Sequence, residues 1–292
     1  MKQIPPRWSS FAELTKPRIT FFILMSTAIG FLFGAHLAPA WTWMQLFHTL
    51  LGTCLIASGT AALNQWYESE PDAMMARTKA RPIPSGRLTS HEALLFGLSI
   101  AAAGFAELCL GVNVLTGLLG LFTLASYLFV YTPLKRVSPI STTIGAIPGA
   151  MPPLIGYAAA SGRLNFEAGI LYAILFLWQF PHFYAIAWMY REDYARAGIR
   201  MLSVVEPDGD STARRIVWFS LALVPMSLAP SFFSMAGNVY LFGALILGTL
   251  VVYAGLRVSS QRTILRARQV LLASVIYLPL LYGLLVLDGK HF

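Results

Sequence analysis

The stretch Asn64-Gln-Trp-Tyr-Glu68-Ser-Glu70-Pro-Asp72-Ala-Met-Met-Ala-Arg77-Thr-Lys79-Ala-Arg81-Pro82 ends an apolar segment in a chain that otherwise avoids charge. Asn64, Glu68 and Asp72 are spaced four residues apart, so on a helix they fall near one face. Oxygen ligands of this kind suit Mg²⁺, which prefers carboxylates, water and phosphate oxygens. Because Pro71 lacks a backbone donor, we expect the helix to kink or end just before Asp72.

Three basic residues, Arg77, Lys79 and Arg81, follow the acidic ones directly. Guanidinium and ammonium groups are strong hydrogen-bond donors to phosphate oxygens. A solvated helix end with ordinary loop charges is the simpler alternative, but it does not require the regular spacing of the acidic side chains. The stretch therefore indicates a metal-assisted reaction on a diphosphate.

The composition is that of a membrane protein. Of 292 residues, 57% are hydrophobic and 12% are charged, whereas soluble domains carry about 25% charged residues. At about 20 residues per crossing, nine segments are long enough to span a bilayer. They run roughly over residues 20–38, 44–63, 94–112, 114–130, 140–160, 168–188, 216–235, 239–256 and 270–287. We expect one all-α membrane domain over residues 1–292, with a polar N-terminal stretch over residues 1–18.

The distribution of basic residues predicts the orientation of these segments. Of 21 Lys and Arg residues, all but Arg163 and Lys290 fall on one side of the predicted membrane. The positive-inside rule places that side, with the N-terminus, in the cytoplasm and Phe292 outside. The net charge of +8 is thereby explained by topology, without a nucleic-acid partner. A bacterial cytoplasmic membrane is the simplest location, with the acidic stretch at its cytoplasmic face.

Two further motifs contain candidate site residues. Tyr131-Thr-Pro-Leu-Lys135-Arg136 ends a predicted span, where two bases satisfy the positive-inside rule alone but also suit a diphosphate. His182 lies inside an apolar segment, in Trp178-Gln-Phe-Pro-His182. Such a histidine is either a packing residue or a functional group such as an iron ligand or proton carrier. Asp193 either joins a second Mg²⁺ site or pairs with Arg191 or Arg196, and the spacing leaves both open.

These motifs resemble those of the UbiA-type intramembrane prenyltransferases, and within them the branch that farnesylates haem. The resemblance covers nearly the whole chain. Besides the motifs above, it includes Leu14-Thr-Lys16-Pro17-Arg18, Gly145-Ala-Ile-Pro-Gly149-Ala-Met-Pro-Pro153-Leu-Ile-Gly156 and Tyr190-Arg-Glu-Asp193-Tyr-Ala-Arg-Ala-Gly198-Ile. The chain departs from the usual pattern at several positions. Glu68 and Glu70 stand where Asp is usual, Ser141 where Asn is usual, and Arg200 and Ser203 where Pro is common; of the second acidic motif only Asp193 is present.

The resemblance implies a nine-helix bundle around a central cavity, in which farnesyl diphosphate and haem B are the substrates. Mg²⁺ would be held by Asn64, Glu68 and Asp72, and the diphosphate by Arg77, Lys79, Arg81, Lys135 and Arg136. A vinyl group of haem B would accept the farnesyl group, and water would complete haem O. His182, Tyr131, Tyr190, Arg191 and Asp193 are the candidate acceptor contacts. Haem A synthase or terminal-oxidase assembly factors are the candidate protein partners.

Two other functions fit parts of the sequence. A quinone precursor or a chlorin could replace haem as the acceptor within the same fold. A transporter of an anionic lipid or metabolite is the alternative from another class, and it would be expected to show inverted repeats and helices broken near the membrane midplane. The polar residues here cluster at one membrane face, which favours the enzyme.

Overall fold

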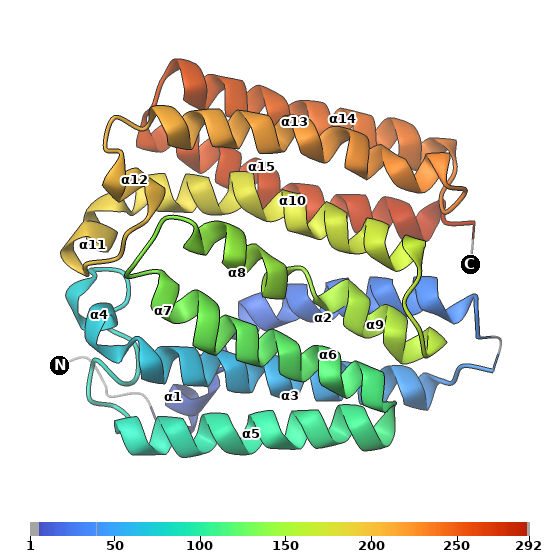
Figure 1. Cartoon of the computed structure of the whole chain (residues 1–292), viewed down its shortest axis with the longest axis horizontal. Helices are drawn as coiled ribbons and strands as arrows, with labels where there is room; N and C mark the ends of the chain where they lie inside the picture. Colours follow the sequence, from blue (N-terminus) through green and yellow to red (C-terminus); the bar gives the residue numbers. More distant parts are fainter. Residues whose placement is uncertain (1–5, 39, 291–292) are drawn as a thin grey trace.

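The chain folds into a bundle of long helices that run nearly parallel or antiparallel to one another (Figure 1). The computed structural model describes residues 6–38 and 40–290. Residues 1–5 of the predicted polar N-terminus and the predicted outer end at Phe292 lie outside this range. Within it, eight helical segments are long and apolar enough to span a membrane. They are α2 (Pro17–Ala35), α3 (Trp43–Tyr67), α5 (Ser90–Gly111), the run through α6 and α7 (Val114–Leu134), α10 (Phe166–Met189), α13 (Asp210–Phe232), α14 (Asn238–Ser260) and α15 (Ile264–Leu287).

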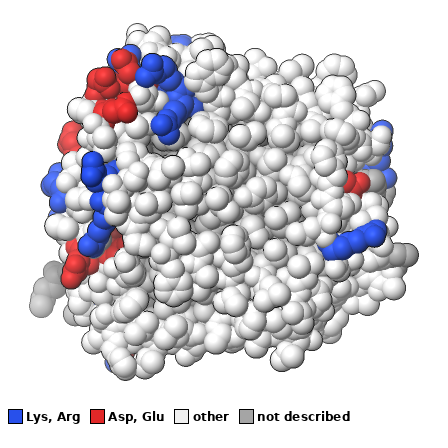
Figure 2. Space-filling view, viewed as in Figure 1, with Lys and Arg blue, Asp and Glu red and all other residues white. Residues whose placement is uncertain are grey.

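The surface of the bundle is that of a protein in contact with lipid. Large apolar side chains, among them Phe21, Phe129 and Phe242, are more than half exposed. In Figure 2, charged side chains gather mainly at one end of the bundle and more sparsely at the other, with an uncharged band between them. Such a band matches the hydrocarbon core of a bilayer. The chain is therefore a multi-pass membrane protein.

The predicted span over residues 140–160 is not one continuous helix. This segment forms two short helices, α8 (Ser141–Gly149) and α9 (Pro152–Ser161), which follow one another along the bundle (Figure 1). Pro152 and Pro153 have no backbone N–H, so they cannot donate to the carbonyl groups one turn earlier. The two prolines thus account for the break in an otherwise apolar segment.

Neighbouring helices fit closely around this break. Gln179 of α10 donates to the Ala146 carbonyl of α8 at 3.0 Å, and a Cβ on Gly149 would lie 1.9 Å from the Gln179 side-chain oxygen. On the other side, a Cβ on Gly156 would lie 1.9 Å from the Thr27 carbonyl of α2. Small residues permit this close helix approach, so the glycines of the motif have a packing role.

Short helices lie at one end of the bundle. They are α1 (Arg7–Leu14), which precedes α2, and α4 (Ser69–Met74), α11 (Arg191–Arg196) and α12 (Leu202–Val205), which lie together on the left of Figure 1. The run through Val114–Leu134 contains α6 (Val114–Ala125), a π-helix η1 (Ser126–Tyr131) and a last turn α7 (Thr132–Leu134).

The last helix, α15, ends at the opposite end of the bundle. There, beside the turn between α13 and α14, the Asp288 carbonyl accepts from the Gly237 amide at 2.9 Å. The described chain therefore begins and ends at opposite ends of the bundle, as an odd number of crossings requires.

Candidate active site

The acidic residues are placed by the junction between α3 and α4. The Glu68 amide donates to the Asn64 carbonyl at 2.9 Å, and the Asp72 amide donates to the Glu68 carbonyl at 2.9 Å. Helical hydrogen bonding thus continues across the junction and keeps the three side chains near one face. The predicted interruption lies at Glu68 rather than just before Asp72. It falls there because Pro71 cannot donate to the carbonyl of Tyr67, the last residue of α3.

The three predicted metal ligands are buried. Asn64 is 2%, Glu68 9% and Asp72 1% exposed. Buried carboxylates require counter-charges or hydrogen-bond donors, because water no longer solvates them. The structure therefore raises the question of which groups neutralise Glu68 and Asp72.

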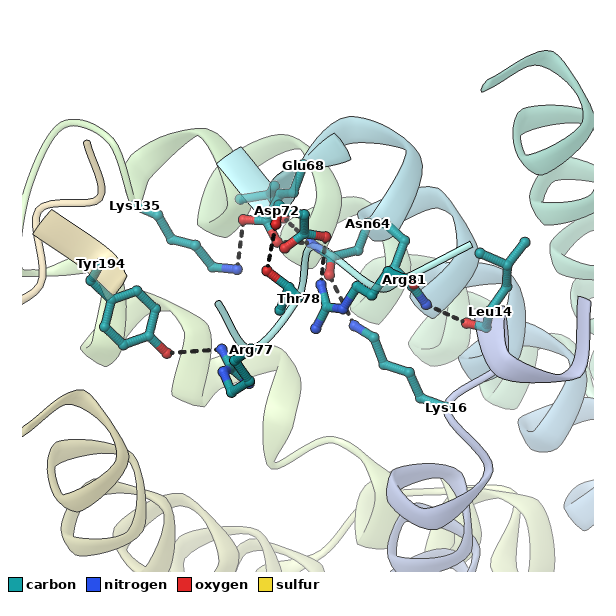
Figure 3. A network of polar contacts seen from close by, with 12 residues as sticks. Leu14, Lys16, Asn64, Glu68, Asp72, Arg77, Thr78, Arg81, Lys135 and Tyr194 are labelled. Atoms are coloured by element: carbon teal, nitrogen blue, oxygen red, sulfur yellow. Dashed lines mark hydrogen bonds and ion pairs between the residues drawn. The ribbon is translucent and has the colours of Figure 1, made fainter. Parts of the chain in front are cut away.

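Each of the three ligands contacts a different cation, as Figure 3 shows. The Lys16 ammonium donates to Asn64 Oδ1 at 3.1 Å. The Lys135 ammonium donates to Glu68 Oε1 at 2.8 Å. Arg81 Nη1 lies 2.5 Å from Asp72 Oδ2. Asn64 Nδ2 completes the network by donating to Glu68 Oε2 at 2.9 Å.

Unusual backbone conformations position the two lysines. Lys16 adopts a left-handed conformation, with φ 49°, immediately before Pro17 opens α2. Lys135 follows the π-helix η1, and such π-helical turns are frequent at functional sites. The same segment places Thr132, whose hydroxyl accepts from Asn64 Nδ2 at 3.3 Å. The Lys135 ammonium also lies 4.4 Å from the centre of the Tyr131 ring.

The electrostatic environment differs between three charged groups of the cluster, Lys16, Glu68 and Asp72. Burial alone would raise the pKa of Glu68, but Lys135, together with Lys16 and Asn64, outweighs burial and lowers that pKa. Burial raises the pKa of Asp72, and Arg81 offsets only part of this effect. Burial lowers the pKa of Lys16 to about 7, and the nearby Arg81 contributes in the same direction. Burial, the larger cause, and Arg81 thus both disfavour the charged form of Lys16.

Asp193 ties the loop after α4 to α11. Its carboxylate accepts from the Ala76 amide at 3.2 Å and from the Arg77 amide at 3.3 Å. It also forms an ion pair with Arg196. Of the pairings that the sequence leaves open, the structure selects Arg196 rather than Arg191. Asp193 thus anchors the backbone that carries the basic part of the acidic–basic stretch.

The other predicted binding residues lie around the same end of the bundle. The Arg77 guanidinium lies 5.0 Å from the centre of the Tyr190 ring and reaches the Tyr194 hydroxyl at 3.5 Å. Arg191 packs instead on Trp188, 4.6 Å from its ring centre. Within the described part of the chain, three predicted phosphate ligands are exposed and outside the ion-pair network: Arg77, Lys79 and Arg136.

His182 is placed apart from this network, between α10 and α15. Its Nδ1 lies 2.9 Å from the Ser274 hydroxyl, and its ring stacks on Trp178 with centroids 4.8 Å apart. Trp178 in turn donates to the Ser274 carbonyl at 2.7 Å. These contacts are those of a packing histidine, so the haem contact stays a prediction.

Sequence reasoning missed Lys16 and Thr132 as site residues. Lys16 belongs to one of the family motifs, but a lysine at a membrane surface is already expected from the positive-inside rule. Thr132 is a small polar residue beside Lys135, and its hydroxyl faces Asn64 because of the π-helix. In both cases the signal that could have found the residue was its place inside a quoted motif.

The donor set fits a hard divalent cation. Two carboxylates and one amide oxygen gather in Figure 3, and oxygen donors of this kind are those that Mg²⁺ prefers. Among the described residues, no group of three or more His, Cys, Asp or Glu side chains is arranged to hold a metal. The protein would therefore supply Asn64, Glu68 and Asp72, and water or phosphate oxygens the remaining ligands.

Known proteins resemble this chain in sequence and in fold. The protoheme IX farnesyltransferase of Solibacter usitatus is 61% identical over 285 residues, which cover 95% of this chain and 98% of that protein. A structure of digeranylgeranylglyceryl phosphate synthase superposes with a TM-score of 0.79 at 17% identity, covering 97% of this chain and 98% of the other. A UbiA homologue from Archaeoglobus fulgidus bound to GPP and Mg²⁺ gives a TM-score of 0.67 at 16% identity, covering 95% and 99%. The sequence model of the UbiA prenyltransferase family matches residues 23–281, and the chain belongs to that family.

Proposed function

We propose that this protein transfers the farnesyl group of farnesyl diphosphate to a vinyl group of haem B, and that addition of water yields haem O. The observation that carries the proposal is the buried cluster of Asn64, Glu68 and Asp72 with its surrounding cations. It occurs in a chain that is 61% identical to a protoheme IX farnesyltransferase. A cluster of this kind suits a metal–diphosphate pair at the end of a membrane-spanning bundle.

The reaction requires the bond between farnesyl C1 and the diphosphate oxygen to break. Mg²⁺ bound by Asn64, Glu68 and Asp72 would neutralise charge on the departing diphosphate. Lys135 and Arg81, with Arg77, Lys79 and Arg136 nearer the surface, would donate to the diphosphate oxygens. Preorganised charges of this kind usually make the largest single contribution to catalysis.

The vinyl group of haem B then attacks the farnesyl C1 and forms a carbon–carbon bond. The positive charge moves to the vinyl carbon next to the macrocycle, where water adds and a proton is lost. The products are haem O and inorganic diphosphate. His182, Tyr131, Tyr190, Arg191 and Asp193 remain the predicted acceptor contacts. Asp193 would act there through the loop that it anchors, since it binds the Ala76 and Arg77 amides.

The proposed location is the cytoplasmic membrane of a bacterium, with the acidic cluster at the cytoplasmic face. The asymmetric distribution of Lys and Arg supports this orientation. Haem A synthase and terminal-oxidase assembly factors are the proposed partners, because haem O made in the membrane must be handed on.

The test uses the purified full chain in lipid nanodiscs with farnesyl diphosphate, haem B and Mg²⁺. We expect haem O in the extracted pigment, identified by mass spectrometry, and none when Mg²⁺ is chelated. Asp72→Asn serves as the site control. Unchanged haem B, or farnesylation of a quinone precursor supplied in its place, would contradict the proposed acceptor.

A further inference from the structure

The cations of the cluster occupy the very oxygen atoms that the proposed metal would need. Lys16 contacts Asn64 Oδ1, Lys135 contacts Glu68 Oε1 and Arg81 contacts Asp72 Oδ2. Resting on the proposed function, we propose that these three cations are internal counter-ions, which hold the metal-binding oxygens in the free enzyme and move onto the diphosphate when Mg²⁺ binds. Mg²⁺ and the diphosphate then bind cooperatively, and Lys16 becomes a further diphosphate ligand.

The balance of charge at the cluster supports this exchange. Two carboxylates, Glu68 and Asp72, face three cations within hydrogen-bond distance of the cluster. Mg²⁺ alone would add positive charge where positive charge is already in excess. A diphosphate alone would have to approach two buried carboxylates. Like charges repel strongly where solvent screens them poorly. Either ligand alone therefore binds weakly, whereas the charges of Mg²⁺ and the diphosphate offset one another when both are bound.

The side chains can make the exchange without leaving a buried charge unpaired. The partner of Lys16 is a neutral amide, so its departure leaves no uncompensated carboxylate on Asn64. When Lys135 leaves Glu68, the metal takes over the carboxylate, while the ammonium keeps the Tyr131 ring at its side. Arg81 belongs to the loop that follows α4, and its side chain is partly exposed.

The coupling between Mg²⁺ and the diphosphate is reciprocal. If Mg²⁺ increases the affinity for the diphosphate by some factor, the diphosphate increases the affinity for Mg²⁺ by the same factor, and such factors are typically about 5 to 150. Counter-ion exchange predicts in addition that removal of a cation changes the two affinities in opposite directions. The metal alone should bind more tightly, and the diphosphate alone more weakly.

Lys16→Met is the sharpest variant, because it removes a cation and frees Asn64 Oδ1 without leaving a charge unpaired. The probe is Mn²⁺, whose free concentration is followed by electron paramagnetic resonance in nanodiscs holding the full chain. We expect Mn²⁺ alone to bind at least about fivefold more tightly than to the wild type, because even two single charges about 4 Å apart in water repel one another by that factor and Mn²⁺ carries two charges. Farnesyl thiolodiphosphate in the presence of EDTA should bind more weakly.

Matched variants separate this effect from a change in fold. Arg18→Met removes an exposed charge two residues away and should leave Mn²⁺ affinity unchanged, while Lys16→Arg should restore the wild-type values. If Lys16→Met does not fold, Lys16→Gln tests the same point, because it keeps a donor for Asn64. Unchanged or weaker binding of Mn²⁺ alone in the folded variant would overturn the exchange. A wild type that fails to bind Mn²⁺ and the analogue even together would overturn the proposed function as well.

Discussion

The ion pair between Glu68 and Lys135 gives the strictest test of the site geometry. Its side chains are 12% and 11% exposed, and the charged atoms lie 2.8 Å apart. At an effective dielectric constant of about 20, that separation corresponds to about 6 kcal/mol of attraction, most of which is offset by the loss of hydration. Removal of one partner leaves the other charge buried and unpaired, which costs about 3–5 kcal/mol.

We therefore expect Lys135→Met and Glu68→Gln each to lower the free energy of unfolding by about 3 kcal/mol. The double variant leaves no unpaired charge, so it should be more stable, by at least about 2 kcal/mol, than the sum of the single changes implies. The measurement is reversible unfolding in mixed micelles, followed by tryptophan fluorescence. The exposed pair between Arg7 and Glu92 is the matched control, and its loss should cost less than about 1 kcal/mol. Additive effects at Glu68 and Lys135 would refute the buried pair.

Four further expectations follow from the same structure. Asp72→Asn should lower the rate of haem O formation at least about a hundredfold in folded protein, and near-normal turnover would contradict the proposed location of the metal site. Asp193→Asn should weaken the anchoring of the 76–77 backbone, seen as faster hydrogen exchange there and a higher KM for farnesyl diphosphate. His182→Ala should weaken haem B binding and alter the Soret band of the complex; a lowered melting temperature with an unchanged spectrum would assign it to packing. Gly156→Ala should destabilise the fold by about 1–3 kcal/mol, measured by thermal unfolding, because its Cβ would collide with α2.

Most of the fold could be predicted from the sequence, because a span requires only length and apolar composition. Eight of the predicted segments correspond to long helices. The break within residues 140–160 could not be predicted from average hydropathy, because that average does not register a missing backbone N–H donor. Two adjacent prolines, Pro152 and Pro153, decide the break through the hydrogen bonds that they cannot make.

The site was predictable where it depends on local spacing. Asn64, Glu68 and Asp72 are spaced four residues apart, and helical hydrogen bonds across the junction of α3 and α4 keep them on one face as that spacing predicts. Contacts between distant parts of the chain could not be predicted. Lys16 reaches Asn64 across 48 positions through a left-handed backbone conformation, and no pattern in the sequence specifies either.

The separation of these partners along the chain also bears on how the protein matures during synthesis. Glu68 leaves the ribosome 67 residues before Lys135, and the Ala76 amide precedes its acceptor Asp193 by 117 residues. Until those later segments are made, the carboxylate of Glu68 lacks its ion pair with Lys135, and it is stabilised where water reaches it. The nascent chain must therefore hold the junction of α3 and α4 at the membrane surface while the following helices insert. The backbone at Ala76 and Arg77 gains its anchor only after α11 arrives, so the site is complete only in a chain that extends to Asp193.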